Sequence, residues 1–141
     1  MHLFSSSEED TIRLGEKIGH LLKGDEVICL VGGLGAGKTT LVKGIAKGMG
    51  IFEGYQVRSP TFTLVNEYPT EKGPLIHADL YRVRELDLSE FLRKGVLLVE
   101  WGEGLEICEC TIKIEEQEGK RVFDFFRCEG LFKKLLRDKV C

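Results

Sequence analysis

A glycine-rich segment, GGLGAGKT, occupies residues 32–39 of this chain. It follows the short apolar run Val27–Val31, and after it apolar residues recur at helical spacing up to Met49. A short, continuous apolar run that contains β-branched residues is typical of a strand buried on both faces. The order of strand, glycine loop and helix therefore predicts an α/β domain with a parallel centre to its sheet.

The glycine segment fits the pattern G-x-x-x-x-G-K-[ST], with Gly37, Lys38 and Thr39 at its end. Glycines allow several backbone N–H groups to point at phosphate oxygens, and the following helix adds its positive end. We expect Lys38 to reach the β- and γ-phosphates of a nucleotide, and the Thr39 hydroxyl to ligate magnesium. The residues predicted to bind phosphate are Gly33, Leu34, Gly35, Ala36, Gly37, Lys38, Thr39 and Thr40.

Two carboxylates follow apolar runs that resemble buried strands. Glu100 ends Val96–Val99, and Asp79 ends Leu75–Ala78. A magnesium ion at a phosphate loop usually has a second anchor of this kind. We therefore predict that Lys38, Asp79 and Glu100 are catalytic, with one acid holding the metal and the other positioning a water molecule.

Three neighbouring features have more than one interpretation. His77 lies inside a predicted strand, where a lone histidine is more often structural than catalytic. Trp101 packs in the core or forms a wall of the nucleotide pocket. The hydroxyls of Ser59–Thr63 would sense a γ-phosphate, as switch loops do, or serve only the local turn.

The remaining pattern predicts a three-layer, P-loop NTPase-like α/β domain over residues 1–141, with a mixed sheet that is parallel at its centre and antiparallel at its edge. The expected helices are 7–23, 86–94 and 131–139, besides the one after the glycine loop. The expected strands are 61–68, 75–80 and 96–101, with a terminal hairpin formed by 111–116 and 121–127.

The composition restricts the class of protein. The net charge of −3 does not favour a nucleic-acid binder, and no apolar run approaches a membrane span. The N-terminus lacks the order of a signal peptide, so we expect a cytoplasmic chain. Five cysteines, an odd number, argue against a disulfide framework, and the C-x-C pair at Cys108 and Cys110 is only a weak metal signal. Scarce Asn and Gln beside abundant Lys and Glu favour a heat-adapted source, whereas the five cysteines argue against one.

Four segments together carry a family resemblance. They are GGLGAGKTTLVKGIAKGMG (32–50), VRSPTFTLVNEY (57–68), HADLYR (77–82) and LLVEWGE (97–103). The residues in these four segments, and the order of the segments, resemble those of the TsaE family, once called YjeE. The resemblance covers roughly residues 8 to 105. The phosphate loop alone is generic, but the other three segments are specific to that family.

The resemblance implies an ATPase in the threonylcarbamoyl modification of adenosine beside the tRNA anticodon. Such a protein binds ATP or ADP with Mg²⁺, works with the partners TsaD and TsaB, and meets tRNA only through that complex. ATP hydrolysis would reset the complex between turnovers. By position, Lys38 and Thr39 match the phosphate and magnesium residues, Glu100 the magnesium-associated acid and Asp79 the hydrolysis-linked aspartate. Thr61 lies in the switch-like segment.

The resemblance also adds nucleotide contacts outside the loop. Trp101 matches a tryptophan beside the site, Glu103 follows in the same motif, and Glu8 loosely matches a region near the adenine. The segment 83–94 is shorter than the family usually has, and the C-terminal part matches no known pattern. Two other functions stay open: a small-molecule kinase, and a nucleotide-gated scaffold whose hydrolysis is incidental. A guanine-specific switch is disfavoured, because no Asn-Lys-x-Asp segment is present.

Overall fold

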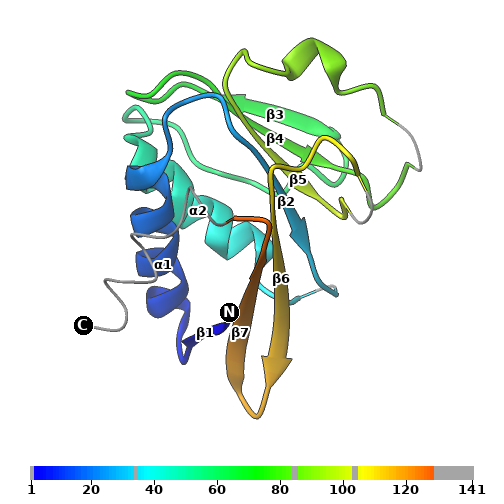
Figure 1. The fold of residues 1–141 in the computed structure, drawn as a ribbon. Coiled ribbons are helices and arrows are strands. Elements are labelled where there is room, and N and C mark those ends of the chain that lie inside the picture. Colours follow the sequence, from blue (N-terminus) through cyan, green and yellow to red (C-terminus); the bar gives the residue numbers. More distant parts are fainter. Residues whose placement is uncertain (1, 34, 84–85, 103–104, 129–141) are drawn as a thin grey trace.

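The computed structural model describes residues 2–33, 35–83, 86–102 and 105–128, and Figure 1 shows their arrangement. The described residues form a seven-stranded sheet in the order β1-β7-β6-β2-β5-β4-β3. The strands are β1 His2–Ser5, β2 Val27–Val31, β3 Val65–Tyr68, β4 Leu75–Asp79, β5 Val96–Glu100, β6 Cys110–Gln117 and β7 Lys120–Phe126. The helices are α1 Glu8–Leu21, α2 Lys38–Met49 and the short 3-10 helix η1 Ser89–Phe91.

The sheet is mixed. Strands β6, β2, β5 and β4 run parallel to one another at its centre. Strand β3 pairs antiparallel with β4 at one edge, and β7 and β1 continue antiparallel from β6 at the other. The predicted α/β class, with a parallel centre and antiparallel edges, is confirmed.

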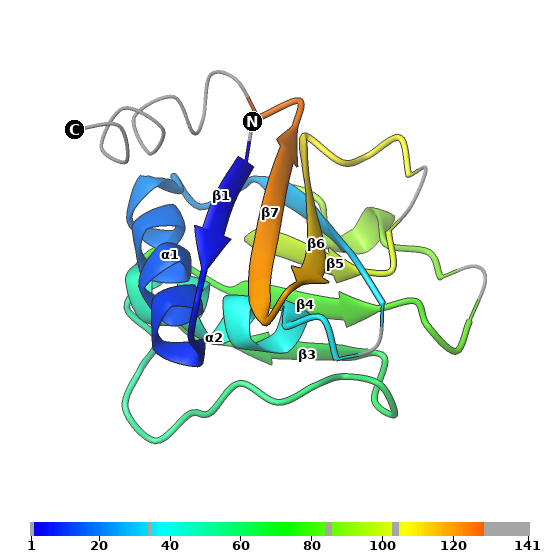
Figure 2. The same ribbon diagram turned by 90° about the horizontal axis from the view of Figure 1, so that it is seen from below.

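The two faces of the sheet are covered differently. Helices α1 and α2 both pack on one face and share an apolar cluster with inward side chains of the strands. On the other face, the segment around η1 and the loop 105–108 cover a second cluster. Figures 1 and 2 show the two helices together on one side of the sheet. The third layer of the predicted domain is therefore built from η1 and loops.

Helices α1 and α2 approach each other through glycines. A Cβ atom at Gly15 would lie 2.6 Å from the carbonyl oxygen of Leu41 and 2.7 Å from Cα of Gly44. One turn further along, Gly19 and Gly48 form a second contact of the same kind. Helix α2 is thereby held close to α1, and its N-terminus is fixed beside the end of β2.

Some predicted elements differ from the structure. The strand predicted to begin at Thr61 begins at Val65, because Leu64 has a left-handed backbone with φ of 70° and interrupts any extended run. The helix predicted over 86–94 is only η1, since its apolar residues reach the sheet without a continuous helix. Strand β1 was not predicted. The predicted helix 131–139 lies outside the described residues.

The expectation of unpaired cysteines is wrong. Cys29 is bonded to Cys108, and Cys110 is bonded to Cys128. The fold brings the Cα atoms of these pairs to 5.7 Å and 4.6 Å across sequence separations of 79 and 18 residues. Cys108 and Cys110 therefore serve two separate bridges and not one metal site.

Within the described part of the chain, no helix combines the length and the apolar character needed to cross a lipid bilayer.

Candidate functional site

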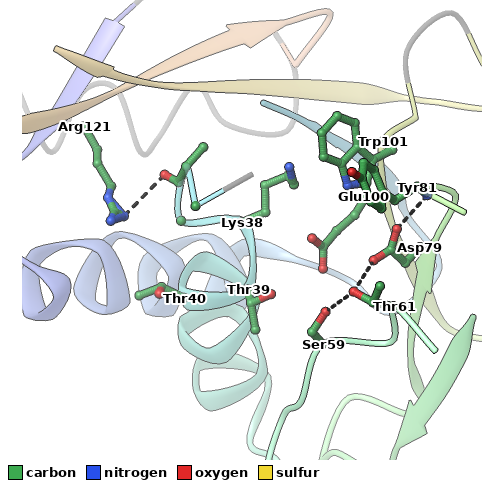
Figure 3. Close-up of a pocket in the computed structure, with 13 residues that line it drawn as sticks. Lys38, Thr39, Thr40, Ser59, Thr61, Asp79, Tyr81, Glu100, Trp101 and Arg121 are labelled. Carbon is green, nitrogen blue, oxygen red and sulfur yellow. Dashed lines mark hydrogen bonds between the residues drawn. The ribbon is translucent and has the colours of Figure 1, made fainter. Parts of the chain in front are cut away.

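A cavity of about 300 Å³ opens at the carboxyl ends of β2, β4 and β5 (Figure 3). Parallel strands end at the same edge of a sheet, and this edge is where α/β proteins bind ligands. The cavity is lined by Gly35, Ala36, Gly37, Lys38, Thr39, Thr40, Ser59, Thr61, Asp79, Tyr81, Glu100, Trp101 and Arg121. Most of the residues that the sequence predicts for the site therefore lie around one space.

The glycine loop enters this cavity directly from β2. Gly35 and Gly37 have left-handed backbones, with φ of 77° and 106°, which glycine adopts at low cost. The Ala36 N–H donates to the Gly33 carbonyl at 3.1 Å, so the loop is closed on itself before α2 begins. Gly33 faces a neighbouring hollow beside β6, and Leu34 lies outside the described residues.

Lys38 is the first residue of α2 and is buried. Its ammonium donates to the carbonyl oxygens of Gly32 at 2.5 Å and Gly33 at 3.1 Å. The same ammonium lies 3.8 Å from the centre of the Trp101 ring, a cation–π distance. The cation is therefore held between its own loop and an aromatic wall of the cavity.

The two predicted acids are neighbours. Asp79 and Glu100 are paired residues of the adjacent parallel strands β4 and β5. Because side chains alternate along a strand, both face the same side of the sheet as α2. Each is at most 3% exposed, which is unusual for carboxylates without a functional or structural role.

Asp79 is fixed by two donors. Its Oδ2 accepts a hydrogen bond from the Thr61 hydroxyl at 3.1 Å, and its Oδ1 accepts one from the Tyr81 N–H at 2.8 Å. The Thr61 hydroxyl also lies 2.7 Å from that of Ser59. The predicted switch segment and the predicted hydrolytic acid thus form one hydrogen-bonded chain, visible on the right of Figure 3.

Glu100 is paired with a buried histidine. Its Oε2 lies in hydrogen-bonding contact with Nε2 of His77, which is completely buried in β4. Nδ1 of His77 has no hydrogen-bond partner among the described residues. Since His77 does not line the cavity, its position fits a support for Glu100 better than direct catalysis.

Trp101 turns the chain out of β5. Its backbone is left-handed, with φ of 61°, and strain of this kind concentrates at functional sites. The Trp101 N–H donates to the carbonyl of Leu30 in β2, and the ring contacts that of Tyr81 at a centroid distance of 4.8 Å. Of the two interpretations of Trp101, the cavity wall is the one that the geometry supports.

One predicted nucleotide contact, Glu8, is not at the cavity, and the structure does not describe another, Glu103. Glu8 begins α1 and is exposed, and it does not line the cavity. Glu103 lies outside the described residues. Conversely, sequence reasoning missed Tyr81 and Arg121. Tyr81 belongs to the HADLYR segment and could have been included, whereas nothing near Arg121 in sequence marks it.

The donor set suits a hard cation. The Thr39 hydroxyl and the carboxylates of Asp79 and Glu100 all line the cavity, and oxygen ligands of this kind are those that Mg²⁺ prefers. No group of three or more His, Cys, Asp or Glu side chains suited to a metal occurs in residues 2–33, 35–83, 86–102 and 105–128. A magnesium ion here would take its other ligands from phosphate and water, as Mg²⁺ does beside nucleotides.

Comparisons with known proteins show which family this chain resembles. The family model described as "Threonylcarbamoyl adenosine biosynthesis protein TsaE" covers residues 5–123. The tRNA threonylcarbamoyladenosine biosynthesis protein TsaE of Aquifex aeolicus is 57% identical over 122 residues, which are 86% of this chain and 92% of that protein. The protein of the same name from Treponema pallidum is 41% identical over 81% of this chain and 89% of its own length.

A solved structure shows the same fold. The crystal structure of YdiB from Bacillus subtilis superposes with a TM-score of 0.83 at 33% identity, covering 99% of this chain and 95% of that one. The matched region contains the glycine loop, both buried acids and the strands that position them. This chain belongs to the TsaE family of threonylcarbamoyladenosine biosynthesis proteins.

Proposed function

We propose that this protein binds ATP with Mg²⁺ and hydrolyses it as an accessory subunit in the biosynthesis of tRNA threonylcarbamoyladenosine. The observation that carries the proposal is the meeting of Lys38 and Thr39 with the buried pair Asp79 and Glu100 around one cavity. A phosphate loop that faces two carboxylates at the ends of parallel strands is the arrangement of nucleotide-hydrolysing sites.

Each residue has a role in this proposal. The backbone N–H groups of 35–39 hold the β-phosphate, and Lys38 carries positive charge to the transferred phosphoryl group. Thr39 and Glu100 would hold a magnesium ion, which would offset negative charge on the phosphates. Asp79 accepts a hydrogen bond from the attacking water, while Thr61 and the Tyr81 N–H keep its carboxylate in place.

The coupling to partners runs through the switch segment. Ser59 and Thr61 line the cavity, and the neighbouring Phe62 is 83% exposed. We propose that ATP orders this segment for the TsaB–TsaD pair, and that loss of the γ-phosphate loosens it. A ligand shifts such an equilibrium only by its differential affinity for the two states. Affinity for the pair should therefore differ between ATP, ADP and no nucleotide.

The first experiment measures ATP hydrolysis by this chain alone and then with TsaB and TsaD. We expect slow turnover alone, stimulation by the pair, and a loss of about 10²-fold in Lys38→Ala, since one charged group at the phosphoryl is removed. Hydrolysis that survives Lys38→Ala unchanged would refute the site. Stable binding of the pair without stimulation would favour the scaffold.

Asp79→Asn separates a resetting ATPase from a scaffold. Asparagine keeps the shape and one acceptor but removes the charge, so hydrolysis should fall while ATP binding persists. A resetting ATPase would then support about one round of tRNA modification and stall. A scaffold would modify tRNA at the normal rate. Asp87→Asn, an exposed acid outside the cavity, is the control and should leave both rates unchanged.

A further inference from the structure

Arg121 enters the nucleotide cavity from a different part of the chain. It is the second residue of β7 and lies 85 residues after Ala36, its contact in the glycine loop. Its Nη1 donates to the carbonyl of Ala36 at 3.3 Å. A side chain at Gly37 would collide with this guanidinium, so the two groups are in direct contact.

The charge of Arg121 is available to a ligand. A guanidinium carries five N–H donors, and the single contact to Ala36 is a long one. Among the described residues, no carboxylate lies within ion-pair distance of Arg121. A cation that lines a phosphate cavity without a carboxylate partner fits an anionic ligand there.

The position of Arg121 in the cavity indicates which part of a bound nucleotide it would contact. In Figure 3, Arg121 lies on one side of Lys38, while Asp79, Glu100 and Thr61 lie on the other. The acids mark the end where the γ-phosphate and the metal would be, because Asp79 and Glu100 would position the water and the cation there. Arg121 therefore marks the opposite end, toward the α-phosphate and the nucleoside.

We infer that Arg121 binds the nucleoside-proximal phosphate of the nucleotide and so contributes to affinity for ATP and ADP alike, not to hydrolysis. This inference rests on the proposed function, since it assumes that the cavity takes a nucleotide. It also assigns a role to the β6–β7 hairpin, which supplies the cavity with a second cation besides Lys38.

The test compares dissociation constants for ATP and ADP, measured by titration calorimetry, in the wild-type chain, Arg121→Ala and Arg121→Lys. We expect Arg121→Ala to weaken both nucleotides by a similar factor of about 10 to 100, the usual effect of one hydrogen bond to a charged group. The factor should be the same with Mg²⁺ and with EDTA. In hydrolysis assays, KM should rise while kcat stays within about twofold.

Two comparisons distinguish a direct contact from mere bracing of the loop. Arg121→Lys keeps the charge and should recover part of the affinity. Salt screens the attraction between the Arg121 charge and a phosphate. Nucleotide binding by Arg121→Ala, which lacks that charge, should therefore be less sensitive to salt than binding by the wild-type chain. Lys120→Ala, its exposed neighbour on the hairpin, is the control and should bind normally.

The outcomes are distinct. Equal affinities in Arg121→Ala and wild type, in a variant that unfolds at the normal temperature, would overturn the inference alone. If Arg121→Ala weakened the affinity for ATP and left that for ADP unchanged, the inference would also be overturned, because Arg121 would then act at the γ-phosphate. Failure of the wild-type chain to bind either nucleotide would overturn the proposed function and the inference with it.

Discussion

Glu26 holds the turn that leads into β2. Its carboxylate accepts hydrogen bonds from the N–H groups of Lys23 at 2.7 Å, Gly24 at 2.9 Å and Asp25 at 3.1 Å. Burial by itself raises the pKa of this carboxyl, but the backbone N–H donors outweigh burial and leave the pKa below its ordinary value of 4.5. The charged side chain thus fixes the start of the strand that carries the glycine loop.

The pKa of Glu26 predicts a pH dependence of stability. A folded-state pKa below the unfolded value gives stabilisation that is complete above about pH 4.5 and is lost as the pH falls through the folded-state pKa. Glu26→Gln should lower the free energy of unfolding by about 1–3 kcal/mol at pH 7, because a neutral amide satisfies these donors poorly. The deficit should shrink toward pH 3.

Urea unfolding at pH 7, 5, 4 and 3 measures the difference in the free energy of unfolding between Glu26→Gln and the wild-type chain. Glu53→Gln, which changes an exposed carboxylate, is the control. A deficit of constant size across that range would show that the charge of Glu26 is not responsible.

Some residues of the candidate site could be predicted from sequence patterns, and others could not. Lys38, Asp79 and Glu100 could be found because a motif or the end of an apolar run marks each one. Arg121 could not, since only the pairing of β7 with β6, and of β6 with β2, brings it to the loop. The contact of His77 with Glu100 likewise depends on the pairing of β4 with β5.

At the scale of elements, the contact between α1 and α2 decides where the phosphate loop points. Gly15 and Gly19 on α1 meet Gly44 and Gly48 on α2, and no side chain separates the two backbones there. Glycine costs about 1 kcal/mol relative to alanine inside a helix. The close packing of the two helices therefore explains why these four positions are glycine, because it leaves no room for a side chain.

Gly44→Ala should destabilise the protein although alanine favours helix. The new Cβ would lie 2.9 Å from Cα of Gly15 and 3.0 Å from the carbonyl carbon of Ile12, so the helices must separate. Overpacking of this kind costs about 1–3 kcal/mol, more than the gain in helix propensity. Thermal unfolding measures it. The exposed Lys43→Ala on the same helix is the control; a Gly44→Ala protein that melts above wild type would contradict the prediction.

Elements with a strong internal signal could be predicted closely. Strands β2 and β5 and helix α2 have continuous apolar runs or helical spacing with a glycine at the end. Strand β1 could not be predicted, because His2–Ser5 is short and exists only by pairing with β7. The apolar residues of 86–94 suggest a helix, yet they cover the sheet as η1 and flanking loop. In both cases a distant partner decides the local structure.

At the scale of the molecule, the two disulfides lie on opposite faces of the sheet. Cys29 and Cys108 belong to the cluster under η1, while Cys110 and Cys128 border the cluster under the helices. Each bridge therefore ties together residues beneath one face of the sheet, and the two bridges act on different apolar clusters.

Counting thiols tests this arrangement. The two disulfides use four of the five cysteines, so the denatured chain should show one reactive thiol before reduction and all five after it. Reduction should lower the free energy of unfolding by about 2–4 kcal/mol for each bridge. A Cys29→Ser, Cys108→Ser variant should show somewhat less than half of the change on reduction, because the remaining bridge closes the smaller ring. Five reactive thiols in a sample never exposed to reductant would contradict the bonding.

The same two bonds also divide the chain into closed rings. One ring runs from Cys29 to Cys108 and contains every residue that lines the cavity except Arg121, and the second ring, from Cys110 to Cys128, contains Arg121. A protease that cuts one exposed loop inside either ring, such as the one around Phe62, leaves both pieces covalently joined. The whole site would then survive a single cut as one molecule, and a gel would reveal the cut only after reduction.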